Sequence, residues 1–114
     1  MKKFTLALLI LFTSSSIFSQ AVVTIGPYLQ SPAPTSIKIM WRSDIAATSK
    51  VIYGTTPGNL NLTATDNNSV TKHTVLITGL TPYTKYYYAV YNGNTFGAGN
   101  DNEHYFRTFP NSND

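Results

Sequence analysis

The chain has 114 residues, no cysteine and a formal net charge of +3 at neutral pH. This length allows one domain of ordinary size, and it excludes a TIM barrel or a full doubly wound nucleotide-binding fold. The lack of cysteine excludes disulfides, thiolate zinc sites and thiol nucleophiles together.

Residues 1–19 predict a secretory signal peptide. Lys2 and Lys3 precede an apolar run over 4–12, and small residues then lead to a predicted cut after Ser19. The apolar run is too short to cross a bilayer, which takes about 20 apolar residues. We therefore expect an exported protein, periplasmic or extracellular, with no stable membrane span after cleavage.

The charge of the remaining chain does not favour a nucleic-acid partner. Without Lys2 and Lys3, six basic residues stand against five acidic ones, and they are scattered along the sequence. Proteins that bind a phosphate backbone carry a basic stripe that neutralises several phosphates. We expect no nucleic-acid binding.

From residue 20 onward, short alternating runs separated by turn residues predict strands. The first strand covers 21–30, and Pro27 within it indicates an edge position or a bulge. Ile37, Ile39 and Trp41 in the run 36–42 alternate with Lys38, Met40 and Arg42. This pattern is typical of an antiparallel sheet with one face in solvent. Trp41 is the expected large core residue of that run, and a short connection is expected over 44–48.

The second half of the chain continues the same pattern. Further strands are predicted over 49–54, 60–64, 70–78, 84–92 and 103–109. Glycine and asparagine dominate 92–102, where we expect a long loop, and 111–114 is a polar tail or a truncated linker. Seven short strands without helical periodicity predict a seven-stranded antiparallel β-sandwich of the immunoglobulin-like type, with an up-and-down barrel as the alternative.

The segment 80–90 resembles the crossing from one sheet to the other in fibronectin type III domains. The resemblance implies that Leu80 closes the base of the core, Pro82 fixes the turn, and Tyr86 forms a tyrosine corner with its hydroxyl bonded back to the backbone. The structural core is then expected to include the following residues: Trp41, Leu80, Pro82, Tyr86, Tyr88 and Val90.

Alternation along the same segment places other tyrosines on the opposite side. Tyr87 and Tyr91 fall on the outward face, and Tyr83 lies nearby in the preceding turn. Exposed aromatic side chains often mark a docking surface, because they offer a large contact area at low entropic cost. The alternative is ordinary stabilisation between neighbouring strands.

Five segments together resemble the N-terminal domain of bacterial purple acid phosphatases, and they occur in matching order and spacing: 26–30, 39–42, 51–55, 78–88 and 106–110. The resemblance covers nearly all of residues 22–110 and implies a single such domain over 20–110. In that family the sandwich precedes a metallophosphoesterase domain, which binds two metals and hydrolyses phosphate monoesters. No metal motif of that catalytic domain follows Pro110, so the resemblance transfers no catalytic residue, metal ligand or cofactor to this chain.

The resemblance therefore implies a non-catalytic module of an exported purple acid phosphatase-like enzyme. Its expected partner is a metallophosphoesterase domain in the same chain, if the chain is truncated, or an unknown partner in trans. The alternative is an independent exported binding or adhesion module for carbohydrate or protein.

The remaining polar residues offer little for catalysis. His73 and His104 are the only histidines, and a two-metal site needs several converging ligands. We expect both histidines on or near the surface. Asp101 and Glu103 have oxygen ligands suited to calcium, but the expected structure there is a solvated loop.

Overall fold

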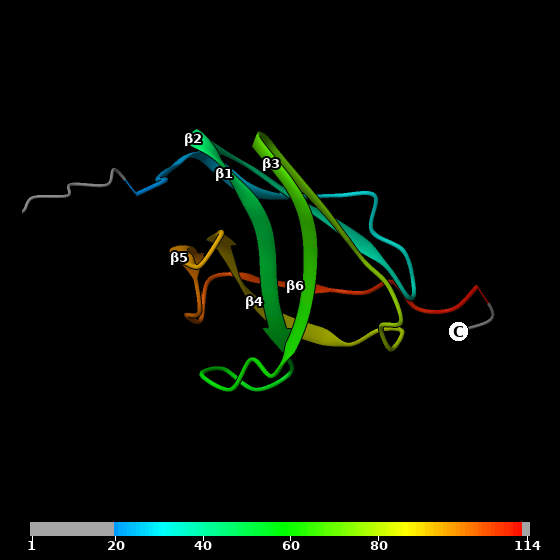
Figure 1. Ribbon diagram of the computed structural model, residues 1–114. Coiled ribbons are helices and arrows are strands. Elements are labelled where there is room, and N and C mark those ends of the chain that lie inside the picture. The colour runs from blue at the N-terminus through cyan, green and yellow to red at the C-terminus, as the bar shows by residue number, and fades with distance from the viewer. Residues whose placement is uncertain (1–19, 113–114) are drawn as a thin grey trace, which may run out of the picture.

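The computed structural model describes residues 20–112, which form strands, turns and loops without a helix (Figure 1). The strands are β1 (Val23–Gln30), β2 (Ile37–Gly54), β3 (Leu62–Ile77), β4 (Lys85–Asn92), β5 (Thr95–Gly99) and β6 (Tyr105–Arg107). The predicted signal peptide over 1–19 and the last two residues of the predicted tail lie outside the described residues.

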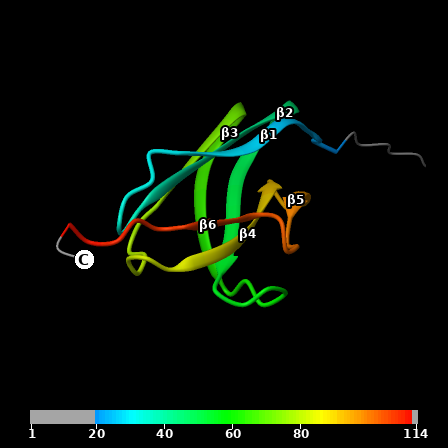
Figure 2. The same ribbon diagram turned by 180° about the vertical axis from the view of Figure 1, so that it is seen from behind.

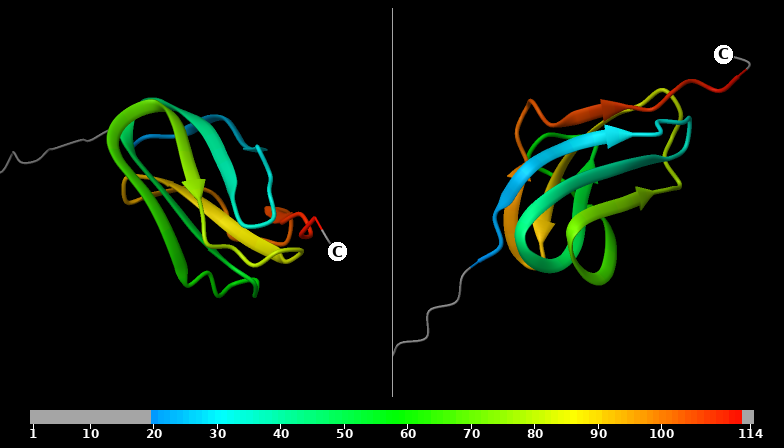
Figure 3. Two further views of the ribbon diagram at one scale, coloured as in Figure 1. Left: turned by 90° about the vertical axis from the view of Figure 1, so that its right-hand side faces the viewer. Right: turned by 90° about the horizontal axis from the view of Figure 1, so that it is seen from above.

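Two long strands build both layers of the sandwich. The first half of β2 pairs with β1 and with the second half of β3. The second half of β2 pairs with the first half of β3 and with β4, which in turn pairs with β5 and β6. Figure 3 shows β2 and β3 turning over together at one end, so that one hydrogen-bonded ladder supplies two facing layers.

The prediction of an all-β antiparallel sandwich is confirmed, but the prediction of seven strands is wrong. The runs 36–42 and 49–54 belong to the single strand β2, and the expected connection over 44–48 is part of it. Register shifts between Arg42 and Ser49 absorb the bend without ending the strand. In the same way β3 unites the predicted strands over 60–64 and 70–78.

The predicted loop over 92–102 contains a strand that the sequence did not suggest. β5 pairs with the end of β4 through Ala89 and Gly99, and through Val90 and Ala98. Gly99 has a φ of +101°, and a Cβ built on it would lie 2.4 Å from the Tyr88 carbonyl oxygen. The glycines that indicate a loop in the sequence are thus what lets β5 approach the backbone of β4.

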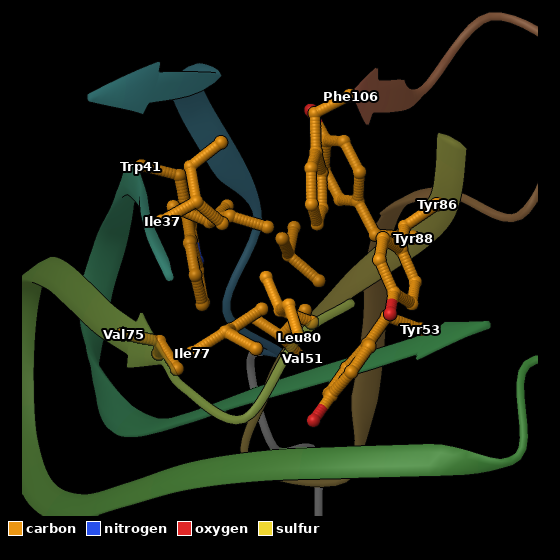
Figure 4. Close-up of a cluster of buried hydrophobic side chains, with 12 residues drawn as sticks. Ile37, Trp41, Val51, Tyr53, Val75, Ile77, Leu80, Tyr86, Tyr88 and Phe106 are labelled. Carbon is orange, nitrogen blue, oxygen red and sulfur yellow. The ribbon is translucent and has the colours of Figure 1, made fainter. Parts of the chain in front are cut away.

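The core lies between the two layers (Figure 4). Ile37, Ile39 and Trp41 project inward from β2 and are at most 1% exposed. Tyr86 and Tyr88 project from β4 on the other side, so their rings face Ile37, Ile39 and Trp41 across the core. The remaining buried members of the cluster are Val51, Tyr53, Val75, Ile77, Leu80, Val90 and Phe106.

The chain leaves the sandwich at the end where β1 joins β2. The Phe109 N–H donates to the Ala33 carbonyl, and the Phe109 carbonyl accepts from the Tyr83 N–H. These two bonds tie the segment after β6 to both neighbouring loops. Figure 2 shows this C-terminal segment leaving on the side opposite the start of β1.

Candidate functional site

Tyr86 is held by a hydrogen bond to the turn before its own strand. The Thr81 N–H donates to the Tyr86 hydroxyl oxygen over 2.9 Å. The ring is 5% exposed, lies 5.5 Å from the ring of Phe106 and meets Tyr53 edge-on at 6.1 Å. Leu80 is buried beside it, and Pro82 is half-buried in the turn. The phenol therefore fixes the geometry of the turn that carries Tyr83.

We expect Tyr86→Phe to destabilise the fold by about 1 kcal/mol, because the Thr81 N–H loses its acceptor while the ring stays in place. Urea denaturation of the two proteins measures the difference. Tyr87→Phe is the matched control, since Tyr87 is half-buried on the other side of β4, and its effect should stay within about 0.5 kcal/mol. Equal effects of the two substitutions would contradict a special role for the Tyr86 hydroxyl.

His73 lies fully buried at the bend of the long strands, so the expectation of a surface histidine is wrong. The side chain is 1% exposed, and its ring stacks on Trp41 with centroids 4.7 Å apart. Its Nε2 lies 2.7 Å from the hydroxyl of Ser43, and its Nδ1 lies 2.7 Å from that of Ser49. Ser43 and Ser49 stand on either side of the bend in β2, so the imidazole bridges the two layers.

The hydrogen bonds around His73 select one tautomer. The Ser43 hydroxyl donates to the Ile45 carbonyl over 2.8 Å, so its oxygen accepts from His73 Nε2–H. Nδ1 is then the acceptor, and the Ser49 hydroxyl donates to it. A second ring proton would face the Ser49 oxygen and displace that donor. The neutral imidazole therefore matches both serines as they stand.

We expect the protein to lose stability as the pH falls from about 8 to 5, because burial lowers the pKa of His73 below its ordinary value near 6.5. The unfolded chain then binds a proton at a higher pH than the folded chain does, so acid favours unfolding. Thermal melts across that range measure the effect. A His73→Asn variant is the control. It should be less stable throughout but show a smaller change with pH, and a wild-type melting temperature that rises on acidification would contradict the prediction.

The outward side of β4 and β6 carries a group of rings and cations that we call the tyrosine–cation cluster, made of Tyr83, Lys85, Tyr87, Tyr105 and Arg107. The ammonium of Lys85 lies 4.1 Å from the ring centroid of Tyr105 and 5.1 Å from that of Tyr87. Arg107 lies over Tyr83 at 5.0 Å. Tyr87 and Tyr105 face each other across the two strands with centroids 6.0 Å apart.

The structure divides the predicted docking tyrosines between two places. Tyr83 and Tyr87 belong to the tyrosine–cation cluster. Tyr91 lies farther along β4, where its ring meets Phe96 of β5 edge-on at 5.7 Å and carries Lys50 at 4.7 Å. Between them Ala89 is fully buried. Sequence reasoning did not single out Tyr105 and Arg107, since only the pairing of β6 with β4 brings them to this face.

The acidic loop over 100–104 uses its carboxylate internally. Asp101 Oδ1 accepts from the backbone N–H groups of Glu103 and His104, and it lies 2.9 Å from His104 Nδ1. The hydrogen bond from His104 and then that from the Glu103 backbone hold the pKa of Asp101 below its ordinary value. The His104 ring also meets Tyr88 edge-on at 5.7 Å. These contacts order the loop that leads into β6.

No three His, Cys, Asp or Glu side chains of residues 20–112 come together as a metal site requires. The same residues include no helix long and apolar enough to cross a bilayer.

Comparisons with solved structures give distant matches that show the fold. A short form of the sensor domain of the anti-sigma factor RsgI4 of Pseudobacteroides cellulosolvens matches with a TM-score of 0.50 and 16% identity, covering 81% of this chain and 97% of that one. The solution structure of that sensor domain matches with a TM-score of 0.53 and 13% identity, covering 77% and 74% respectively. A comparison with curated protein sequences gave no match.

The family comparison extends over almost the whole sandwich. The family model for the purple acid phosphatase N-terminal domain matches residues 24–108, from β1 to the residue after β6. This confirms the resemblance found in the sequence. The chain belongs to the family of purple acid phosphatase N-terminal domains.

Proposed function

We propose that this chain is a non-catalytic module of an exported purple acid phosphatase-like metallophosphoesterase. The observation that carries the proposal is the family match, because it covers the sandwich from β1 to just beyond β6. The module's role is to support and position a metallophosphoesterase domain. That domain belongs either to the same chain or to a partner that binds in trans.

The surroundings of both histidines support a structural role. His73 is enclosed between two serines, with each ring nitrogen engaged. His104 is bound to Asp101 beside the ring of Tyr88. A pair of metals about 3.5–4 Å apart needs several convergent ligands, and the described residues do not fit such a centre. We therefore assign the two-metal chemistry to the catalytic domain of the family.

An assay with an aryl phosphate and added divalent metals tests the lack of catalysis. We expect the purified chain to release no phenol above the rate of a heat-denatured sample. Turnover that needs metal, follows the protein through a final sizing column and disappears on chelation would overturn the proposal.

The coding DNA beyond Asp114 tests the arrangement of the two domains. An in-frame continuation into Gly-Asp and Gly-Asn-His motifs would support a catalytic domain in the same chain. A stop codon at that point would overturn the arrangement in which both domains share one chain. The proposal would then rest on a catalytic domain that binds as a separate chain.

Export is tested separately by the mass of the protein recovered from a bacterial host. We expect a mature chain that begins at Gln20, found in the periplasm or the medium. A cytoplasmic product that keeps residues 1–19 would overturn this part of the proposal.

A second candidate function is an exported binding module, which the tyrosine–cation cluster favours. Tyr83 is 63% exposed and Tyr105 is 46% exposed, so their rings offer contact area outside the core. Aromatic rings and arginine are enriched where proteins bind partners. This role is compatible with the first, because the cluster lies on the outward face of β4 and β6 and takes no part in the core.

A further inference from the structure

Two cations of the tyrosine–cation cluster stand directly opposite each other. Lys85 of β4 and Arg107 of β6 are partners in the ladder, so their side chains leave the sheet side by side. Like charges in that position destabilise a sheet. The one ion pair within residues 20–112 joins His104 to Asp101, so no carboxylate of the described chain lies within 4 Å of either cation. Lys85 and Arg107 therefore lie side by side without a carboxylate of the described residues between them.

The aromatic rings hold these cations in place without neutralising them. Lys85 lies over Tyr105 and Tyr87, while Arg107 lies over Tyr83. Cation–π contacts at exposed sites contribute about 0.5–1 kcal/mol and limit the rotamers that the long side chains adopt. Both charges are thus positioned in advance for a ligand that brings a negative group.

Tyr83 provides a second and independent observation. Its φ is +49°, in the left-handed region where a bulky side chain is uncommon. Glycine or asparagine would occupy this turn at lower conformational cost, and the ring gains little burial, since 63% of the side chain is exposed. Unfavourable backbone conformations of this kind cluster at binding sites.

The chemistry of the cluster selects among possible occupants. A second copy of this face would place cations against cations, which opposes association. An apolar protein surface would bury the rings but would also desolvate the charges of Lys85 and Arg107 without pairing them. Tyrosine rings stack on the C–H faces of sugars, and Lys or Arg pairs with a carboxylate. A sugar that carries carboxylates matches both parts of the cluster.

We propose that the tyrosine–cation cluster binds an acidic oligosaccharide of the uronic acid type, with Lys85 and Arg107 on its carboxylates and Tyr83 and Tyr105 on its sugar rings. This inference rests on the binding role proposed above as the second candidate, and it is independent of the link to phosphatases. Its salt dependence follows from the same charges, because ions screen exposed charge pairs.

Affinity electrophoresis and titration calorimetry of the full chain test the proposal. The probes are a polyuronate oligosaccharide, a neutral glucan of equal length, polyglutamate and anionic phospholipid vesicles. We expect binding to the polyuronate that weakens with added salt, and no binding to the neutral glucan. Lys85→Gln and Arg107→Gln should each weaken binding about tenfold. Lys38→Gln and Arg42→Gln are the matched controls, because those cations lie on β2 in the other layer and should leave binding unchanged.

The Tyr83→Asn variant separates binding from folding. Asparagine accepts the left-handed conformation, so we expect a melting temperature equal to or above that of the wild type, together with weaker polyuronate binding. A variant that melts lower and keeps its affinity would show a purely structural role for Tyr83 and overturn its part in the site.

The remaining outcomes also decide the matter. Equal binding of polyglutamate or vesicles would overturn the choice of a sugar but keep a binding function for the face. Polyuronate binding that is lost only in the Lys38 and Arg42 variants would move the site to the other layer. No binding to any of the four probes would overturn both the ligand and its site. That result would not affect the proposed phosphatase module, which the coding DNA tests separately.

Discussion

Replacing Trp41 by alanine is expected to abolish cooperative thermal unfolding of this domain. The side chain is 1% exposed, stacks on His73, and donates from Nε1 to the Asn92 Oδ1 over 2.8 Å. Asn92 in turn donates to the Ala21 carbonyl over 3.3 Å, so the indole joins β2 and β4 to the chain before β1. Removing a buried Trp costs about 3–5 kcal/mol. Total stability of a small domain is about 5–15 kcal/mol, so the loss leaves little margin.

Calorimetry or near-ultraviolet circular dichroism measures this effect, and Trp41→Phe is the matched control. Phenylalanine keeps an aromatic ring beside His73 but leaves the Asn92 oxygen without its donor, which costs about 1–3 kcal/mol. We therefore expect a cooperative but lower melt for Trp41→Phe and a broad, shallow one for Trp41→Ala. A sharp transition of Trp41→Ala within about 5 °C of the wild type would contradict the central role of the indole.

Replacing Gly99 by alanine is the second change with a large expected effect. The new Cβ would lie 2.4 Å from the Tyr88 carbonyl oxygen and 2.7 Å from the Ala89 Cα, and neither backbone atom can move without breaking the pairing of β4 and β5. The φ of +101° adds conformational strain. Together these effects should cost about 3 kcal/mol or more and detach β5.

The control Gly58→Ala separates the two causes of the destabilisation expected for Gly99→Ala. Gly58 has a φ of +79°, but a Cβ built there meets nothing within 4 Å, so only the conformational strain remains. We expect this control to cost about 1 kcal/mol. Hydrogen exchange on β5 provides a local measure, and it should rise in Gly99→Ala while it stays unchanged in Gly58→Ala. Equal destabilisation by the two substitutions would show that close approach of the backbones is unimportant.

Alternation along single strands predicts which side chains face inward. Ile37, Ile39 and Trp41 face the core, as do Tyr86 and Tyr88. This works because successive side chains of a strand point to opposite faces, whatever the strand pairs with. The likeness to fibronectin type III domains stays a prediction.

The same local pattern failed where a strand bends. Residues 44–48 resemble a short connection and 66–68 a turn in the sequence, yet they continue β2 and β3 from one layer into the other. Register shifts in β2 accommodate the bend, and Asp66 Oδ1 accepts from the Asn68 N–H within β3. A bulged or bent strand and a true turn use the same residue types, so composition does not separate them.

His73 shows why part of the candidate site escaped prediction. His73 alternates in register with Val75 and Ile77, which indicates the inward face, but alternation does not show whether a polar ring finds partners there. Burial here is acceptable only because Ser43 and Ser49, about 24 to 30 positions away in the chain, meet both ring nitrogens. Those partners are brought together by the pairing of β2 and β3.

The sequence by itself determined the all-β class, the alternation that builds the core, the place of Tyr86 beside the turn before β4, and the family. The first three depend on residues close together in the chain, and the family depends on the order and spacing of segments over 24–108. The tertiary structure alone decided the number of strands, the buried bridge around His73, and the meeting of Tyr105 and Arg107 with Tyr83 and Lys85. The physical reason is that side-chain alternation has a period of two and names only a face, whereas neighbours on that face are set by the register of strands that lie far apart in the sequence.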